Sequence, residues 1–144
     1  MRIRPVQIAA PVNPDRRYAR RAARSGRARV FFFDERAYLE PKGFWTRSEG
    51  RATVVIDADE DARRTGLPIA FTAGGAATTI GISVGDWSQS YSMTPGERRT
   101  VTLPPLGDEA AWVVNIHSGP GFRPFEREPG SIDVRSLAAW FEIP

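Results

Sequence analysis

Apolar and polar residues alternate along several short segments of this chain. In the last third, segments 112–116 and 137–143 place every second residue on one apolar face, which is the period that a β-strand imposes. The same period recurs over 52–56, 67–71 and 78–84. No long segment has the period of an amphipathic helix. The pattern therefore predicts a chain built mostly of strands.

Turn-forming residues separate these segments at short intervals. Gly85-Asp86 suits a two-residue hairpin loop, and Pro95-Gly96 suits a type II turn, so residues 78–103 are predicted to form an antiparallel meander. Strand signals at such spacing are typical of a sandwich or a jelly roll. We predict an all-β fold, a two-sheet antiparallel β-sandwich that is jelly-roll-like, with its first and last strands in the same region.

Size and composition fit one folded domain. The chain has 144 residues, of which 41% are apolar and 26% are charged. It has no cysteine, which excludes a disulfide framework and a cysteine nucleophile. No apolar run reaches the roughly 20 residues of a membrane span, and the first residues lack the apolar core of a secretory signal. We therefore expect a soluble chain without a readable export signal.

Basic residues are concentrated at the N-terminus. Nine of the 20 lie within residues 1–29 beside one acid, whereas the rest of the chain has 11 basic and 16 acidic residues, a balance of −5. Asn13-Pro14-Asp15 is typical of a helix start, and Gly26 of a helix end. We predict an Arg-rich arm over residues 1–28, weakly structured or a short helix, and a β-sandwich domain over 29–144. Because the arm offers few apolar residues, we expect the fold to survive deletion of residues 1–27.

Two segments of the body resemble a known family. They lie in VFFFDERAYLEPKGFWTRSEG (30–50) and GFRPFEREPGSIDVRSLAAWFEI (121–143), where the resembling residues run from Asp34 to Arg47 and from Phe122 to Glu142. The second segment has the motifs F-x-P-x-E, D-x-R-x-L and W-x-E. Both segments resemble the C-terminal β-sandwich accessory domain of bacterial polytopic membrane proteins that look like glycosyltransferases using lipid-linked sugars. Ser136 and Ala138 stand where such domains often have Tyr and Gly, and the 144 residues contain no counterpart of the membrane part.

The resemblance implies an accessory role and a location, but no catalytic residue. A domain of that family would be extracytoplasmic or membrane-associated. Without the resemblance, a cytoplasmic location is expected. The compartment is therefore left open.

The single histidine is a weak catalytic candidate. By strand parity, His117 lies opposite the apolar face that contains Trp112, near a strand end. No nucleophile-elbow motif accompanies it, and one histidine without cysteine is too few for an ordinary zinc site. A hydrogen-bonded strand-end histidine is the favoured interpretation.

Loop carboxylates are the other catalytic candidates. Glu126, Glu128 and Asp133 lie on one loop, whereas a glycosidase pair must flank a substrate cleft. Asp133 and Arg135, two residues apart, are better explained as pinning this loop through charge-assisted hydrogen bonds. We predict no catalytic residue, and a hydrolase that uses the loop carboxylates or His117 is the alternative.

No motif indicates a metal or a cofactor. Residues 57–61 reproduce the D-x-D-x-D start of a calcium loop, but Ala62 replaces the required glycine and Pro68 the bidentate glutamate, which excludes an EF-hand. A solvated loop paired with Arg63 and Arg64 is favoured over a looser calcium site. The glycines of residues 72–81 lack the P-loop Lys-Ser/Thr pair.

Strand parity divides the large aromatic residues. Trp87 and Trp112 share faces with apolar residues and are predicted in the core. Trp140 lies on the opposite face of its strand from the apolar residues, Phe32 lies off the face of its neighbours, and Trp45 adjoins a bent segment. Outward aromatic rings can stack on sugars or cover a partner. The predicted ligand-binding residues are Trp140, Trp45, Phe32, Asn115 and His117.

The arm suggests further partners. Its arginines could hold anionic lipid headgroups and place the domain beside a membrane. Nucleic acid is not favoured, because single-strand binders interleave aromatic residues that the arm lacks apart from Tyr18. The sequence therefore predicts a non-catalytic accessory β-sandwich module that binds a carbohydrate or a protein, associated with a membrane glycosyltransferase if the resemblance holds. A structural or oligomerisation domain is a further alternative.

Overall fold

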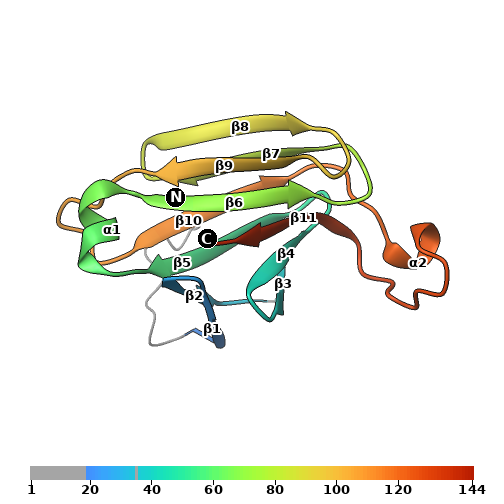
Figure 1. The fold of residues 1–144 in the computed structure, drawn as a ribbon, viewed down its shortest axis with the longest axis horizontal. Coiled ribbons are helices and arrows are strands. Elements are labelled where there is room, and N and C mark those ends of the chain that lie inside the picture. The colour runs from blue at the N-terminus through green and yellow to red at the C-terminus, as the bar shows by residue number, and fades with distance from the viewer. Residues whose placement is uncertain (1–18, 35) are drawn as a thin grey trace, which may run out of the picture.

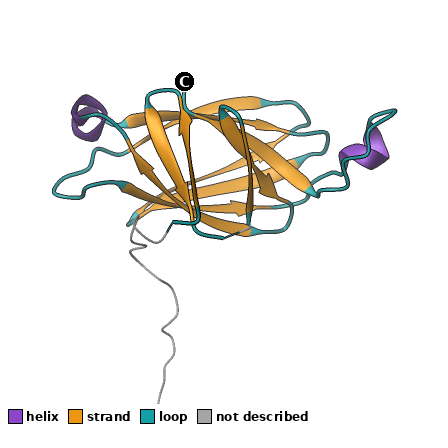
Figure 2. Ribbon diagram, turned by 90° about the horizontal axis from the view of Figure 1, so that it is seen from below, coloured by secondary structure: helices purple, strands orange, loops and turns teal. Residues whose placement is uncertain are grey.

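Two antiparallel sheets packed face to face make up the described part of the chain (Figure 1). The computed structural model describes residues 19–34 and 36–144. Two short helices lie at opposite ends of the sandwich (Figure 2). The helices are α1 (Glu60–Thr65) and α2 (Pro124–Arg127). The strands are β1 (Arg21–Ser25), β2 (Ala28–Phe32), β3 (Ala37–Glu40), β4 (Gly43–Arg47), β5 (Arg51–Asp57), β6 (Leu67–Ala73), β7 (Thr78–Val84), β8 (Trp87–Met93), β9 (Arg98–Leu103), β10 (Trp112–Ser118) and β11 (Leu137–Glu142).

The strand order is that of a jelly roll. One sheet has the order β1-β2-β5-β10-β7-β8, and the other has the order β3-β4-β11-β6-β9. The eight strands from β4 to β11 pair in a nested way, because β4 lies beside β11, β5 beside β10, β6 beside β9, and β7 beside β8. This nesting defines the jelly roll. It confirms the predicted fold class, an all-β antiparallel sandwich of two sheets. The first predicted strand corresponds to β2 and the last to β11, and these two strands belong to different sheets.

Alternate residues of both sheets meet in one core. Phe141 stacks on Phe44 on one side and on Phe71 on the other, with ring centroids 5.4 and 5.2 Å apart. Trp112 has no exposed surface, and its Nε1–H donates to the Pro104 carbonyl oxygen at 2.7 Å. The buried indole thus has a partner for its one polar group, as a buried tryptophan requires.

The N-terminal segment differs from the expected arm or short helix. Residues 21–25 form β1, which pairs with β2 through a turn where Gly26 has a φ of 55°. Alternate residues face inward, as in a strand, although Ala and Arg favour helices in isolation. Pairing with β2 outweighs that local preference. The expected helix start at Asn13 and the rest of the arm up to residue 18 lie outside the described residues.

Strand β1 is tied to the end of the chain. The Ser25 hydroxyl donates to the Lys42 carbonyl oxygen at 2.7 Å and accepts from the backbone N–H of Ile143 at 2.9 Å. Ser25 is buried, so these bonds are shielded from water. The sandwich therefore includes residues before the predicted boundary at position 29.

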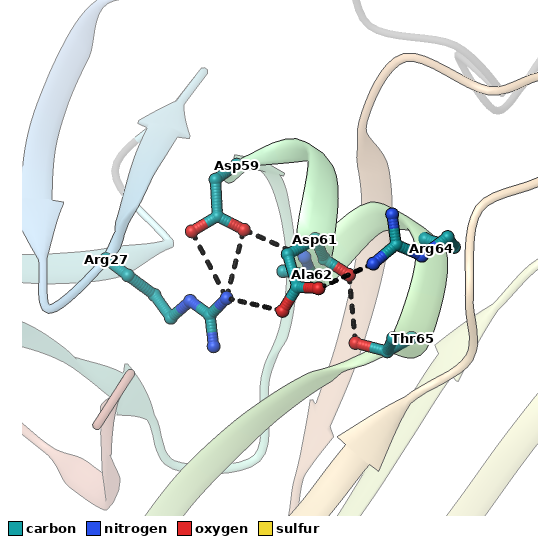
Figure 3. Close-up of polar contacts among 6 residues, drawn as sticks. All are labelled: Arg27, Asp59, Asp61, Ala62, Arg64 and Thr65. Atoms are coloured by element: carbon teal, nitrogen blue, oxygen red, sulfur yellow. Dashed lines mark hydrogen bonds and ion pairs between the residues drawn. The ribbon is translucent and has the colours of Figure 1, made fainter.

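The acidic segment after β5 contains helix α1 where a solvated loop was expected (Figure 3). The Asp59 carboxylate caps it by accepting from the backbone N–H of Ala62 at 2.8 Å, and Arg27 donates to Asp59 at 2.9 Å. Asp61 pairs with Arg64 at 2.8 Å. The Ala62 hydrogen bond, and then Arg27, lower the pKa of Asp59 below its ordinary value. The acids thus cap a helix and pair with arginines.

Candidate ligand-binding face

The outer face of the five-stranded sheet carries three aromatic side chains in one row. Tyr38 of β3 lies opposite Trp45 of β4, and Trp45 lies opposite Trp140 of β11. Thr72 of β6 and Arg98 of β9 continue the same row across the sheet. We call Tyr38, Trp45 and Trp140 the aromatic row. Strand register alone therefore aligns these side chains, which are separated by up to 102 positions in the sequence.

The two tryptophans of the row pack against each other. Their ring centroids are 5.7 Å apart, with the ring planes at 58°, and both residues are half-buried. The next residues along their strands, Phe44 and Phe141, point into the core. Phe122 packs edge-on against Trp45, with the two ring centroids 6.0 Å apart. The result is a partly exposed apolar surface on an otherwise polar face.

Glycine at position 43 makes room for the Trp140 indole. A Cβ atom at Gly43 would lie 2.6 Å from Cζ2 of Trp140, closer than carbon atoms approach. The ring therefore lies over the backbone of β4. This close approach holds Trp140 in a defined orientation.

Polar groups lie at the β9 side of the row. The Nε1–H of Trp140 donates to Oε1 of Glu142 at 3.1 Å, and Arg98 donates to the same oxygen at 3.1 Å. Thr72 lies beside this pair and accepts from Arg98 at 3.4 Å. A ligand stacked on Trp140 would therefore have a carboxylate, a guanidinium and a hydroxyl on the β9 side of the ring.

A second polar group lies at the β3 side. Arg135 Nη2 donates to Glu40 Oε2 at 2.8 Å and to Asp133 Oδ2 at 2.7 Å, and its Nε donates to Asp133 Oδ1 at 2.9 Å. The guanidinium carbon lies 5.2 Å from the ring centroid of Tyr38. These contacts join the loop before β11 to β3, which is the pinning role expected for Asp133 and Arg135.

An open groove of about 600 Å³ runs between the row and this loop. Trp45 and Phe122 supply its aromatic wall, and Glu40, Asp133 and Arg135 supply its charged wall. The Phe122 ring packs on Gly74 and Gly75: a Cβ atom at Gly74 would collide with the ring, and one at Gly75 would lie 3.2 Å from it. Because the two glycines have no side chains, the Phe122 ring can pack on them, and the same residues also form a turn. In the sequence, Phe122 and Glu40 stand out only because they belong to the two segments that carry the family resemblance, and neither was predicted to bind a ligand.

Hydrogen bonds from Arg135 hold the pKa of Asp133 below its ordinary value of 3.8. A folded-state pKa below the unfolded one stabilises the fold above pH 3.8, and the contribution is lost as the pH falls through the folded-state value. The same shift argues against Asp133 as a general acid, which needs a raised pKa.

We expect Asp133→Asn to lower the free energy of unfolding at neutral pH by less than about 1 kcal/mol, because the pair is partly exposed. Thermal melts of the variant and the wild type should converge as the pH falls below 3.8, since protonation removes the charge from the wild type. If the difference in melting temperature between the two proteins stayed constant into that acidic range, Asp133 would act through packing alone.

Asn115 and His117 lie on the other sheet. Both project from the outer face of β10, so the structure does not bring them to Trp45 or Trp140. Asn115 Oδ1 accepts from Thr53 Oγ1 at 2.6 Å. His117 is exposed, and no hydrogen bond of its ring is found within the described residues, in contrast to the favoured interpretation. It borders a polar hollow of about 390 Å³ whose lining contains no carboxylate.

Phe32 is wrongly assigned by the strand-parity argument. It is 2% exposed, and its ring meets that of Phe44 edge-on at 5.3 Å. Ala28, Val30 and Phe32 share the inward face of β2, and Phe31 faces outward. Three consecutive phenylalanines carry no alternation, so the sequence could not show which of them faces the core. Phe32 is therefore withdrawn as a ligand-binding residue.

Tyr38 is the member of the row that sequence reasoning did not select. Strand β3 has only four residues, too few to show a period of two. It joins β4 through a tight turn in which Lys42 has a φ of 76°. A hairpin interpretation of residues 37–47 would have placed Tyr38 opposite Trp45.

Comparisons with known proteins do not extend this description. The chain matches no family model, and no curated protein matches it. The resemblance to a glycosyltransferase accessory domain is therefore still a prediction from two sequence segments.

Proposed function

We propose that this domain is a non-catalytic accessory module that binds a glycan through the aromatic row. The observation that carries the proposal is the register of Tyr38, Trp45 and Trp140 across three neighbouring strands. Apolar C–H faces of sugar rings stack on flat aromatic surfaces, and sugar hydroxyls need polar partners beside them. Arg98 with Glu142 and Arg135 with Glu40 supply such partners on both sides of the row.

A glycan array followed by isothermal titration tests the proposal. We expect wild-type protein to bind a neutral oligosaccharide and Trp140→Ala to lose that binding, because the substitution removes one of the two tryptophan rings of the aromatic row. Phe31→Ala is the matched control, since Phe31 is an outward aromatic residue on the other sheet. Thermal melts must show that both variants remain folded. Unchanged affinity in Trp140→Ala, or no binding to any glycan by the wild type, would contradict the proposal.

A protein partner is the second candidate, and one observation favours it. The exposed large apolar side chains of the described residues are Phe125, Ile132 and Val134, with 59%, 88% and 59% of their surface exposed. All three lie in the segment around α2, which extends from one end of the sandwich (Figure 1). Ile132→Ser should leave glycan affinity unchanged. Loss of glycan affinity in that variant would indicate that the glycan binds to this loop and not to the aromatic row.

The cellular setting is proposed from the sequence resemblance alone. It favours a bacterial accessory domain beside a membrane glycosyltransferase, with the basic N-terminal residues near anionic lipids. Among the described residues, no helix is long and apolar enough to cross a membrane. A glycosyltransferase gene fused to or adjacent to the gene for this chain would support that setting.

A further inference from the structure

Strand β8 forms one edge of the six-stranded sheet, and no described strand lies on its open side. All seven of its residues are in register with β7 on the other side. Figure 1 shows β8 as the outermost strand, in yellow. An edge of this length presents a row of peptide groups that can pair with another strand.

The charge on β8 sets it apart from the other edges. The described sheets end in four edge strands, β1, β3, β8 and β9. Charged side chains are a common protection against edge-to-edge pairing. They occur in the other three edge strands, as Arg21 and Arg24 in β1, Glu40 in β3, and Arg98 and Arg99 in β9. Strand β8, with the sequence WSQSYSM, has neither charge nor proline.

The register with β7 shows which peptide groups face the open side. Val84 lies opposite Trp87 across the two-residue loop Gly85-Asp86, and such a closing pair exchanges both of its hydrogen bonds. Hydrogen-bonded and non-bonded pairs then alternate along the hairpin. The outward peptide groups of β8 are therefore those of its serines, which are Ser88, Ser90 and Ser92.

We propose that β8 pairs antiparallel with β8 of a second copy of this chain, about a two-fold axis at Ser90. In this register Ser90 faces the partner's Ser90, and Ser88 faces the partner's Ser92. All three outward-facing serines then form hydrogen-bonded pairs, and the two six-stranded sheets become continuous. The interface is isologous, as in most homodimers.

The choice of a second copy follows from the sequence of the strand. A two-fold antiparallel pairing opposes a strand to itself, so equal charges lie near each other in β1 or β9 and weaken the pairing. In β8 the opposed side chains are uncharged: serines face serines, Gln89 faces the partner's Tyr91, and Trp87 faces the partner's Met93. An uncharged strand also offers no charge complementarity to an acidic or basic peptide.

Sedimentation velocity over a concentration series tests the pairing in solution. We expect a reversible dimer for the wild type and at least a roughly tenfold weaker dimer for Ser90→Lys, which brings two like charges to the axis. Thr100→Lys is the control, because it adds the same charge at an exposed position of β9. A wild type that stays monomeric throughout, or a Ser90→Lys variant that dimerises normally, overturns the proposal.

A crosslinking measurement locates the axis independently. The chain contains no cysteine, so Ser90→Cys introduces a single thiol. Hydrogen-bonded antiparallel pairs have Cα atoms about 5.5 Å apart, which a disulfide can span. We expect Ser90→Cys to form a disulfide-linked dimer under mild oxidation, whereas Thr100→Cys should remain monomeric under the same conditions. Equal crosslinking of the two variants would also overturn the proposal.

Discussion

Trp112→Ala is expected to lower the free energy of unfolding by about 3–5 kcal/mol. Trp112 has no exposed surface, so alanine would leave a cavity between the sheets. The Pro104 carbonyl oxygen would also lose the indole N–H that donates to it at 2.7 Å. Urea unfolding of the variant and the wild type measures the difference, provided that both show the same denaturant dependence.

Trp140→Ala gives the comparison that separates core from surface. Its indole is half-buried against Trp45, and such an aromatic pair contributes about 0.5–1.5 kcal/mol beyond its buried area. We therefore expect a smaller loss of stability than for Trp112→Ala. If the two losses were equal, Trp140 would be part of the core, and the glycan proposal would lose its central residue.

Deletion of residues 1–27 is expected to destabilise the sandwich, contrary to what the sequence indicates. It removes β1 and with it Ser25, the acceptor for the buried N–H of Ile143. A buried donor without a partner costs about 1–3 kcal/mol. The deletion also removes Arg21, which donates to the carbonyl oxygens of Asp34 and Ala37 at 3.0 and 3.2 Å. Thermal and urea unfolding measure the loss.

Two reference proteins make this deletion informative. A chain that begins at residue 19 keeps β1, and Ser25→Ala in the full chain removes only the hydroxyl. We expect the deletion to 27 to cost more than Ser25→Ala, because it removes the strand as well as the acceptor. Equal stability of the chains that begin at residues 19 and 28 would show that β1 contributes nothing to the fold.

Burial explains why the sandwich was predictable from sequence. Strand β10 buries one face, so apolar residues recur at every second position and the period of two is visible in its sequence. Strand β1 has no such apolar alternation, since its composition is Arg, Ala and Ser, and its pairing with β2 decides its conformation. Helix α1 has a recognisable signal in the sequence: Asp59 as its cap, acids in the first turn and arginines in the last.

The candidate site was only partly predictable. Parity places Trp140 outside, because its neighbours in β11 are apolar and buried. Its pairing with Trp45 and Tyr38 depends on strand order, which alternation does not encode. The same limit explains why Asn115 and His117 seemed compatible with the site, although they lie on the opposite sheet.

The most direct test of glycan binding by the aromatic row is an NMR titration that follows the four tryptophan indole N–H signals. Each signal can be assigned by a single Trp→Phe substitution. We expect added oligosaccharide to shift the signals of Trp45 and Trp140 and to leave those of Trp112 in the core and Trp87 at the other sheet edge unchanged. Shifts confined to Trp87, or no shift in a protein that binds the sugar, would contradict the assignment of the binding face to Tyr38, Trp45 and Trp140.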